Sequence, residues 1–469
     1  MIENSRLLPA KINLALHPIR SEDVSLQSFY LHLLHAAIQG LGERGRVARD
    51  ILAAYQEAWN IPLENRKPTL NLDQIVGMLQ KREHWREFWK FHERGYKYLL
   101  LFEMMFIYLD EFEFIHNCDF IQEFQRRLAI GPVSLHQLRH TLRLLLQGRI
   151  GEAEKHAPNV GDFRFFFDTF RNEEQFACLP EKKIAVVATM SSGKSTVLNA
   201  LLGRKVFPSA NQACTSKIVR WTHRPGLSRL TAYARNTGVD IRWQLTLDEM
   251  RQWNSDPSIP SVYIEGGDGP LSSFRSRKVV FIDTPGTNNS RDDRHGRITQ
   301  DFLHGEDYDA VMYILDATNL ATEDDQTLLH QTLEAAKGKQ MVFLLNKVDA
   351  LDMEAGETIT GMLEMAVSYL RENGVPNPFV IPVSAYAALL FKLALGGQEF
   401  SRKETRDLDR LYALYQDESY DMNRYVRMGH PQETWDGDSV AEDNGVPYPR
   451  ERLQLALYRT GLSLLPKIF

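Results

Sequence analysis

A run of small and hydroxylated residues ending in Gly-Lys-Ser-Thr stands directly after the short apolar segment 183–188. The run comprises Ser191, Ser192, Gly193, Lys194, Ser195 and Thr196. Backbone N–H groups of such a loop can surround a phosphate, and the positive end of a following helix favours an anion. The lysine would reach the terminal phosphates of a nucleotide, and the Ser195 hydroxyl would bind Mg²⁺. The pattern therefore predicts a phosphate-binding loop between a strand and a helix.

One position of this loop departs from the usual pattern GxxxxGK[ST]. Ala188 replaces its first glycine. Alanine keeps the side chain small, so we expect phosphate binding to persist if the backbone there does not need a positive φ. A chance Gly-Lys-Ser after an apolar strand is the alternative explanation, and further motifs are needed to exclude it.

A second motif, DTPG, follows the apolar run 278–282. Its Asp283 carboxylate could hold Mg²⁺ through water, as the acidic residue after the second strand does in nucleotide hydrolases. Its Gly286 N–H could contact a γ-phosphate and lose that contact on hydrolysis. The motif therefore predicts a metal-binding and γ-phosphate-sensing segment.

A third motif, NKVD, follows the run 341–345 and begins at Asn346. The Asp349 carboxylate could accept hydrogen bonds from N1–H and the exocyclic amine of guanine, and Lys347 would lie along the base. Adenine offers neither donor on that edge, so the carboxylate would be left without partners. The motif therefore predicts guanine specificity.

The last motif, Ser384-Ala385, follows the run 379–383 and could offer a backbone N–H to the guanine oxygen. Four motifs occur in order, each after a short apolar run. Such runs alternating with helical stretches are typical of a mostly parallel sheet with helices on both faces. We therefore predict an α/β P-loop GTPase domain that binds GTP or GDP with Mg²⁺.

The chain before residue 181 has a helical pattern, with one helix expected at 134–147. Aromatic residues recur in the block 73–127: Trp85, Phe88, Trp89, Phe102, Phe106, Phe112, Phe120 and Phe124. We interpret them as the interior of an all-α domain, because aromatic side chains dominate core burial; a lipid- or partner-binding surface is the alternative. Leu179-Pro180-Glu181 marks the boundary, which predicts a helical domain at 1–180 and a GTPase domain with closing C-terminal helices at 181–469.

The composition of the chain favours some classes of protein over others. The 469 residues carry 55 Lys and Arg against 61 Asp and Glu, a balance that does not favour nucleic-acid binding. Three scattered cysteines predict a reducing compartment. The N-terminus has no secretory signal pattern, and the apolar stretch 98–109 is too short to span a bilayer, so we expect a core helix and a cytoplasmic protein.

The phosphate-loop sequence ATMSSGKST, a threonine at Thr215, DTPGTNN and NKVD together resemble the dynamin-like large GTPases, particularly their bacterial members. The long insertion between Thr215 and Asp283 agrees with this resemblance. The resemblance covers residues 181–388, with a weaker similarity at 458–462. It implies GTP hydrolysis, dimerisation with a second copy or a related GTPase across the GTPase face, and peripheral contact with membranes.

The resemblance also implies roles for single residues. Thr215 would bind Mg²⁺ and orient the attacking water through its carbonyl; Ser191 would hold a charge-compensating cation or an activating contact in the dimer. A plain loop residue is the alternative in each case, with Ser216 as a rival to Thr215. With Lys194, these are the expected catalytic residues. Met190 stands where eukaryotic dynamins carry a glutamine, and a thioether cannot donate a hydrogen bond.

Two other functions stay open. A nucleotide-gated interaction switch with slow or no hydrolysis is favoured by Ala188 and Met190, whereas a nucleic-acid-associated GTPase is disfavoured by the charge balance. Dynamin-like proteins continue into a helical stalk, whereas this chain stops where 453–465 reads like the start of a closing helix, so a fragment is one explanation. We further expect edge strands at 230–233 and 261–264, a solvated acidic loop at 416–445, and loop positions for His295 and His304.

Overall fold

The computed structural model describes most of the chain, and the structural statements below concern that part. The described ranges are 11–40, 53–56, 58–59, 85–107, 119–157, 160–208, 217–224, 230–235, 239–242, 244–267, 277–285, 294–305, 307–352, 356–426 and 448–469. The chain divides into two compact units. One comprises Met1–Leu179 with Ile241–Gln244, and the other comprises Pro180–Asp240 with Leu245–Phe469.

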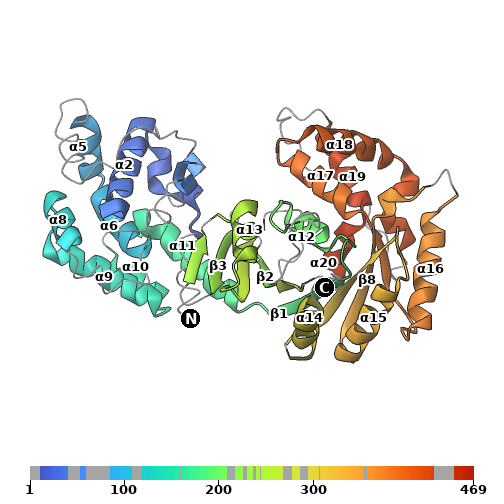
Figure 1. Ribbon diagram of the computed structural model, residues 1–469. Helices are drawn as coiled ribbons and strands as arrows, with labels where there is room; N and C mark the ends of the chain where they lie inside the picture. Colours follow the sequence, from blue (N-terminus) through green and yellow to red (C-terminus); the bar gives the residue numbers. More distant parts are fainter. Residues whose placement is uncertain are drawn as a thin grey trace. The chain divides into compact units, whose positions relative to one another are not determined.

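The first unit consists of helices around an aromatic and aliphatic core (Figure 1). Its described helices are the three-ten helices η2 (Leu14–Leu16) and η3 (Pro18–Ser21) and the α-helices α2 (Val24–Gly40), α5 (Trp85–Glu93), α6 (Tyr96–Ile107), α8 (Asp119–Arg127), α9 (Pro132–Leu146), α10 (Ile150–His156) and α11 (Val160–Ala177). The helix expected at 134–147 is thereby confirmed as α9. Four residues from the insertion after the phosphate loop, Ile241–Gln244, join this unit, and Ile241 packs against its core.

Helix α6 is the central helix of this core, as its apolar sequence predicts. Phe102 and Phe106 are fully buried and contact Phe166 of α11 edge-on, with ring centroids 4.9 and 5.0 Å apart. Glu103 is also buried and accepts a hydrogen bond from the Tyr30 hydroxyl at 2.5 Å. No helix among the described residues is long and apolar enough to cross a bilayer.

The prediction that the aromatic residues form the interior of the helical domain is partly wrong. Trp89 of α5 is 57% exposed. It therefore lies outside the core, and its neighbour Lys90 pairs with Asp23 at 2.5 Å near the solvent. Helical spacing places residues on one face but does not say how far the neighbouring helices extend over that face. The side chains of Trp85, Phe88, Phe112, Phe120 and Phe124 lie outside the described residues.

The second unit is built on a nine-stranded sheet in the order β4-β3-β5-β2-β6-β1-β7-β8-β9. The strands are β1 (Glu181–Ala188), β2 (Ile218–His223), β3 (Thr231–Arg235), β4 (Val239–Arg242), β5 (Ser261–Gly266), β6 (Lys278–Asp283), β7 (Ala310–Asp316), β8 (Gln340–Asn346) and β9 (Val380–Val383). Strand β1 pairs in parallel with β6 and β7, and β7, β8 and β9 continue in parallel. The four apolar runs that precede the motifs are therefore present as β1, β6, β8 and β9, and the carboxyl ends of these parallel strands share one edge.

Helices cover both faces of this sheet, which confirms the predicted α/β architecture. They are α12 (Lys194–Leu202), α13 (Leu247–Ser255), α14 (Arg294–Gly305), α15 (Glu323–Ala335), α16 (Ile359–Glu372), α17 (Ala385–Leu395), α18 (Arg402–Leu414), α19 (Arg450–Arg459) and α20 (Leu465–Ile468), with three-ten helices η7 (Val348–Ala350), η8 (Glu418–Tyr420), η9 (Met422–Tyr425) and η10 (Leu462–Leu464). Successive residues of β1 enter opposite cores: Val186 packs in the core that includes α12, and Val187 in the core that includes α15. Both faces are apolar because a central parallel strand is buried on both sides.

The insertion between the first two motifs differs from its prediction. Strands β3 and β5 exist at the expected places, but neither is an edge strand, because β4 lies outside β3 and β5 lies between β3 and β2. Strand β2 pairs with β6 in antiparallel register, whereas it pairs with β5 in parallel. Alternation of apolar and polar residues along one strand indicates which face of the strand is buried, but not how many strands flank it. The edge assignment failed for this reason.

Two further expectations are wrong. His295 and His304 lie in helix α14 rather than in a loop, and the His304 ring nitrogen Nδ1 contacts the Gln300 carbonyl at 2.9 Å, one turn earlier. The acidic stretch begins with two short helices, η8 and η9, instead of an irregular loop. Asp417 and Asp421 cap them by accepting backbone N–H groups. Residues 427–445 of that stretch lie outside the described residues.

Candidate nucleotide-binding site

The phosphate-loop residues connect β1 to α12 through a sharp turn with left-handed backbone. Gly193 has φ 91° and caps α12, whose first residue is Lys194. A Cβ atom at Gly193 would lie 2.3 Å from Nδ2 of Asn346, so both the conformation and the space require glycine. Ser191 also has a positive φ, 70°, which is unfavourable for a residue with a side chain. Such strain is typical of loops whose N–H groups converge on a ligand.

Ala188, the departure from the phosphate-loop pattern, is compatible with this geometry. It is the last residue of β1 and is buried at 2% exposure. Positive φ values in the described residues occur at Ser191 but not at Ala188. Thr189 and Ser192 then close the turn, with their hydroxyl oxygens 2.6 Å apart. Residue 188 therefore does not need a positive φ, which was the condition for alanine to replace the glycine of the pattern.

Two buried charges meet where β6 ends beside the start of α12. Lys194 Nζ donates to Asp283 Oδ1, and their side chains are only 8% and 1% exposed. Asp283 is the last residue of β6, and Thr284, which follows it, donates to the Val186 carbonyl of β1 at 2.9 Å. The lysine of the first motif and the carboxylate of the second are thus brought together, although 89 residues separate them.

Asn346 connects the phosphate loop to the base-side loops, which are the NKVD loop at 346–349 and the loop at Ser384-Ala385. It ends β8 and is 2% exposed. Its Nδ2 donates to the Ser192 carbonyl at 2.9 Å, and its Oδ1 accepts the Ala385 N–H at 3.1 Å. One amide therefore satisfies groups from two other motifs and sets the spacing between them.

The remaining base-side residues hold one another. Ser384 donates its hydroxyl to Asp349 Oδ1, and burial raises the pKa of the Asp349 carboxyl, against which the Ser384 hydrogen bond acts. Lys347, in left-handed conformation with φ 67°, pairs through Nζ with Asp316 Oδ2 at 2.6 Å. Arg410 of α18 donates to the Asp349 carbonyl at 3.4 Å. The carboxylate predicted to read the base is therefore held by Ser384, and the backbone of the same residue is held by Arg410.

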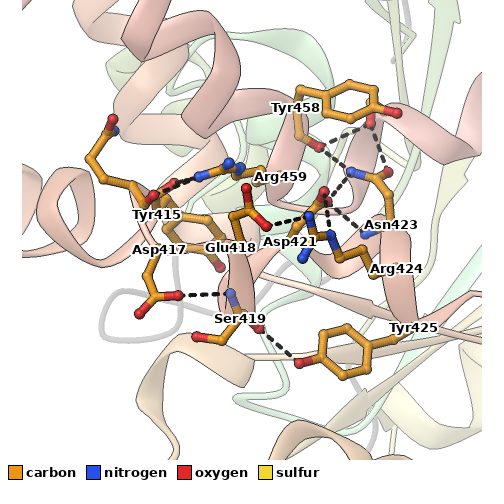
Figure 2. Close-up of polar contacts among 12 residues, drawn as sticks. Tyr415, Asp417, Glu418, Ser419, Asp421, Asn423, Arg424, Tyr425, Tyr458 and Arg459 are labelled. Atoms are coloured by element: carbon orange, nitrogen blue, oxygen red, sulfur yellow. Dashed lines mark hydrogen bonds and ion pairs between the residues drawn. The ribbon is translucent and has the colours of Figure 1, made fainter. Parts of the chain in front are cut away.

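The C-terminal segment supports Ser384 from behind. The Thr460 carbonyl accepts the Ser384 N–H at 3.1 Å. Gly461, with φ 85°, lies so close to β9 that a Cβ there would be 2.3 Å from the Pro382 carbonyl oxygen. Arg459 donates to the Tyr415 and Gln416 carbonyls at 2.9 and 2.8 Å, which ties the end of α19 to the turn after α18 (Figure 2).

The turn after α18 is itself well connected. Asn423 Nδ2 donates to the Tyr458 carbonyl at 2.9 Å, Arg424 pairs with Glu418 at 2.6 Å, and the Tyr425 hydroxyl donates to the Ser419 carbonyl at 2.8 Å (Figure 2). Acidic residues that resemble a solvated loop in sequence therefore act as caps and ion-pair partners beside the base-side loop.

Most of the predicted site residues gather at the carboxyl edge of the sheet. Those with described positions are Ser191, Ser192, Gly193, Lys194, Ser195, Thr196, Asp283, Asn346, Lys347, Asp349, Ser384 and Ala385. Ser195 and Thr196 lie in the first turn of α12 and are partly buried. Thr215 and Gly286 lie outside the described residues. Met190 is 38% exposed in the phosphate loop.

The donor set suits Mg²⁺. The Ser195 hydroxyl and the Asp283 carboxylate are hard oxygen ligands, which Mg²⁺ prefers, and this cation commonly takes only one or two protein ligands together with phosphate oxygens and water. Asp283 is buried among apolar strands, so a nearby cation would offset the cost of burying its charge.

Several residues that build the site were missed by sequence reasoning. Asp316 holds Lys347, and Asn199 of α12 accepts the N–H groups of Val206 and Phe207 at 2.8 Å, which fixes the loop leaving the helix. Thr460 supports Ser384 through its backbone. Asp316 does carry a readable signal, because it ends an apolar strand as Asp283 does; Asn199 and Thr460 carry none.

Comparison with known families agrees with the arrangement of motifs. The model of the dynamin family matches residues 184–262, which contain the phosphate loop and Thr215. The model of ferrous iron transport protein B matches residues 260–367, which contain Asp283, Gly286 and the NKVD motif. Together the two matches cover the first three motifs in their order.

The chain matches only a small part of the length of two relatives. It is 26% identical over 285 residues to a probable transmembrane GTPase, FZO-like and chloroplastic, from Arabidopsis thaliana, covering 60% of this chain and 26% of that protein. It is 26% identical over 174 residues to dynamin-like protein A from Bacillus subtilis (strain 168), covering 37% of this chain and 14% of that protein. A solved oligomerised bacterial dynamin pair is 14% identical with a TM-score of 0.35, covering 84% of this chain and 69% of that one, a likeness too weak to carry an argument.

Proposed function

We propose that residues 180–469 bind guanine nucleotide with Mg²⁺ and hydrolyse GTP to GDP and phosphate, as the match of the dynamin family model to residues 184–262 suggests. The observation that carries the proposal is the Asn346 side chain. It hydrogen-bonds both the phosphate loop at Ser192 and the base-side loop at Ala385. A single site with a phosphate end and a base end at fixed spacing is what a nucleotide requires.

At the phosphate end, Lys194 would neutralise the β- and γ-phosphates while backbone N–H groups of 191–195 stabilise the charge that spreads over the transferred phosphoryl group. Mg²⁺ held by Ser195, Asp283 and Thr215 would supply further charge neutralisation. Lys194 and Asp283 contact one another in this structure, so each would exchange that contact for the phosphate or the metal. Gly286 would sense the γ-phosphate.

At the base end, Asp349 would accept the two guanine donors and Lys347 would lie along the base. The backbone N–H groups of Ser384 and Ala385 are bonded to Thr460 and Asn346 in this structure, so one of them would exchange that contact for the guanine oxygen. The raised pKa of Asp349 reflects a carboxylate in a poorly solvated place. Guanine N–H donors would compensate that charge, whereas adenine would leave it without partners, and this difference is the source of selectivity.

Assembly and location belong to the same proposal. We expect two GTPase domains to form a complex, either two copies or one copy with a related GTPase, in which Ser191 holds a charge-compensating cation or makes an activating contact. The relative from Arabidopsis thaliana is described as a probable transmembrane GTPase, which supports peripheral membrane contact for this chain. Met190 offers no hydrogen-bond donor to position water, so hydrolysis by one domain alone should be slow.

A second candidate is a nucleotide-gated switch with little hydrolysis, favoured by Met190 at 38% exposure in the phosphate loop. Phosphate release measured with and without liposomes, over a range of protein concentrations, separates the two. A rate per protein that rises with concentration or with liposomes supports the GTPase, and a flat, near-zero rate with tight GTP binding supports the switch. The Lys194→Ala variant is the matched blank, since it should bind no nucleotide.

A further inference from the structure

A buried lysine outside the four motifs lies between two helices of the candidate site. Lys392 belongs to α17, the helix that begins at Ala385 of the base-side loop. Its Nζ donates to the carbonyl oxygen of Ala200 at 2.5 Å and to that of Leu201 at 3.3 Å. Both carbonyls are in the last turn of α12, the helix that begins at Lys194 of the phosphate loop. One side chain thus links the far ends of the two helices.

This contact satisfies groups that the helix cannot satisfy itself. The last four carbonyls of an α-helix lack partners within the helix. Asn199 finds its own in the N–H groups of Gly203 and Arg204, whereas Ala200 and Leu201 use the Lys392 ammonium. A cation at the carboxyl end of a helix also interacts favourably with the helix dipole. Helix α12 would therefore have a bound phosphate at one end and a buried cation at the other.

The charged groups around Lys392 are engaged elsewhere. Lys205, after α12, pairs with Glu404 of α18, and Asp407 of α18 accepts from the Tyr386 hydroxyl. On α19, Arg459 binds backbone carbonyls, as described above. His223 of β2 faces Lys392; burial, together with that ammonium, lowers the pKa of His223 to about 4, so the imidazole is neutral near pH 7.

We propose that Lys392 is a positioning residue for nucleotide binding, whose ammonium group fixes the carboxyl end of α12 against α17 and thereby maintains the spacing of the phosphate and base loops. The inference rests on the proposed function. Helix α12 has nine residues, which makes it about 13 Å long at 1.5 Å per residue. Lys392 therefore acts through the helix and does not touch the nucleotide.

The role has a pH signature. Burial lowers the pKa of Lys392 to about 7, so its ammonium form, which has the stronger interaction with two carbonyls, is lost as pH rises through neutrality. Nucleotide binding brings negative charge to the opposite end of α12 and should favour the protonated lysine. Affinity should therefore fall as pH rises through about 7. A lysine that merely fills space would produce no such dependence.

The test uses the full chain and a fluorescent GDP analogue in Mg²⁺ buffer, titrated between about pH 6 and about pH 9, which brackets the lowered pKa of Lys392. Lys392→Met keeps the apolar stem and removes the ammonium; Lys403→Met, at an exposed position on α18, is the matched control. The terminal phosphate of GDP also titrates near the acidic end of this range, so the informative quantity is the ratio of wild-type to Lys392→Met affinity. We expect this ratio to be about 10 at low pH, from the loss of charged hydrogen bonds, and to approach 1 at high pH.

An affinity ratio near 1 throughout, or one that does not change with pH, would overturn the inference. If Lys392→Met does not fold, Lys392→Arg takes its place, because arginine keeps its charge over this range. It should bind GDP with a flatter pH profile than the wild type, and an unchanged profile would contradict the role. A wild-type chain that binds no GDP at any pH would instead refute the proposed function, and the inference with it.

Discussion

The candidate site has two parts that are built in different ways. We call the loops at 346–349 and 384–385 the base edge, and the phosphate loop with Asp283 the phosphate edge. At the base edge, neutral and charged side chains from three loops hold one another, with Asn346, Asp349 and Ser384 already hydrogen-bonded. At the phosphate edge, two buried charges, Lys194 and Asp283, are paired with each other, beside a loop in strained backbone conformation. Guanine recognition would thus depend on a packed framework, whereas phosphate binding would require two charges to change partners.

The largest effect is expected at the phosphate edge. Lys194→Ala removes the cation that would meet the phosphates and leaves Asp283 buried without it, so GDP affinity should fall by more than about 100-fold. Calorimetric titration with GDP measures this loss. Lys337→Ala, an exposed position after α15, should leave affinity unchanged. Retained micromolar affinity in Lys194→Ala would show that this edge does not bind phosphate.

A change of selectivity, not a general loss, is expected at the base edge. Asp349→Asn offers an amide that pairs poorly with guanine but can donate to the oxygen of xanthine, so GDP affinity should fall by about 30- to 100-fold while XDP affinity rises. Competition between GDP and XDP for one fluorescent nucleotide measures the ratio. Asp324→Asn on α15 is the control. An unchanged GDP preference would mean that the NKVD motif is only a loop.

A variant at the connection between the edges should affect both equally. Asn346→Ala removes the partner of the Ser192 carbonyl and of the Ala385 N–H. We expect a loss of about 1–3 kcal/mol in the free energy of unfolding, and about tenfold weaker binding of GDP and XDP alike. Chemical denaturation and the same competition assay measure these effects, with the exposed Asn319→Ala as control. Weaker GDP binding without any stability change would argue against a framework role.

The smallest effect is a pH dependence of selectivity. Burial raises the pKa of Asp349, and guanine recognition uses the ionised carboxylate, so the ratio of GDP to ADP affinity should fall on acidification at a pH above the ordinary Asp value. The ratio cancels the titration of the nucleotide phosphates. Asp349→Asn should lack the dependence. A wild-type ratio that stays constant until the carboxyl reaches its ordinary pKa would contradict a poorly solvated recognition carboxylate.

The two edges also differ in how much of them the sequence predicts. Short apolar runs before each motif predict β1, β6, β8 and β9, because buried parallel strands must be apolar on both faces. Their order along the chain then brings Lys194 and Asp283 to one edge. The hydrogen bond from Asn346 to Ser192 spans 154 residues of sequence, and that from Lys392 to Leu201 spans 191. No local sequence pattern therefore predicts either contact.

Failed predictions share a related cause. The edge assignment of 261–264 failed because the position of β5 depends on the pairing of β2 and β3, which lie elsewhere in the chain. Trp89 is exposed because the reach of neighbouring helices, not its own spacing, decides burial. His304 is helical because α14 continues through it. Local sequence predicts what an element is, whereas its neighbours decide what covers it.

Direct competition of GDP, ADP and XDP for the wild-type chain in the presence of Mg²⁺ tests the central claim, that both edges form one guanine-nucleotide site. We expect micromolar GDP binding, with ADP and XDP each weaker by at least about 100-fold, the size expected when a buried recognition group loses its partners. Equal affinity for the three nucleotides, or no binding of any of them, would contradict it.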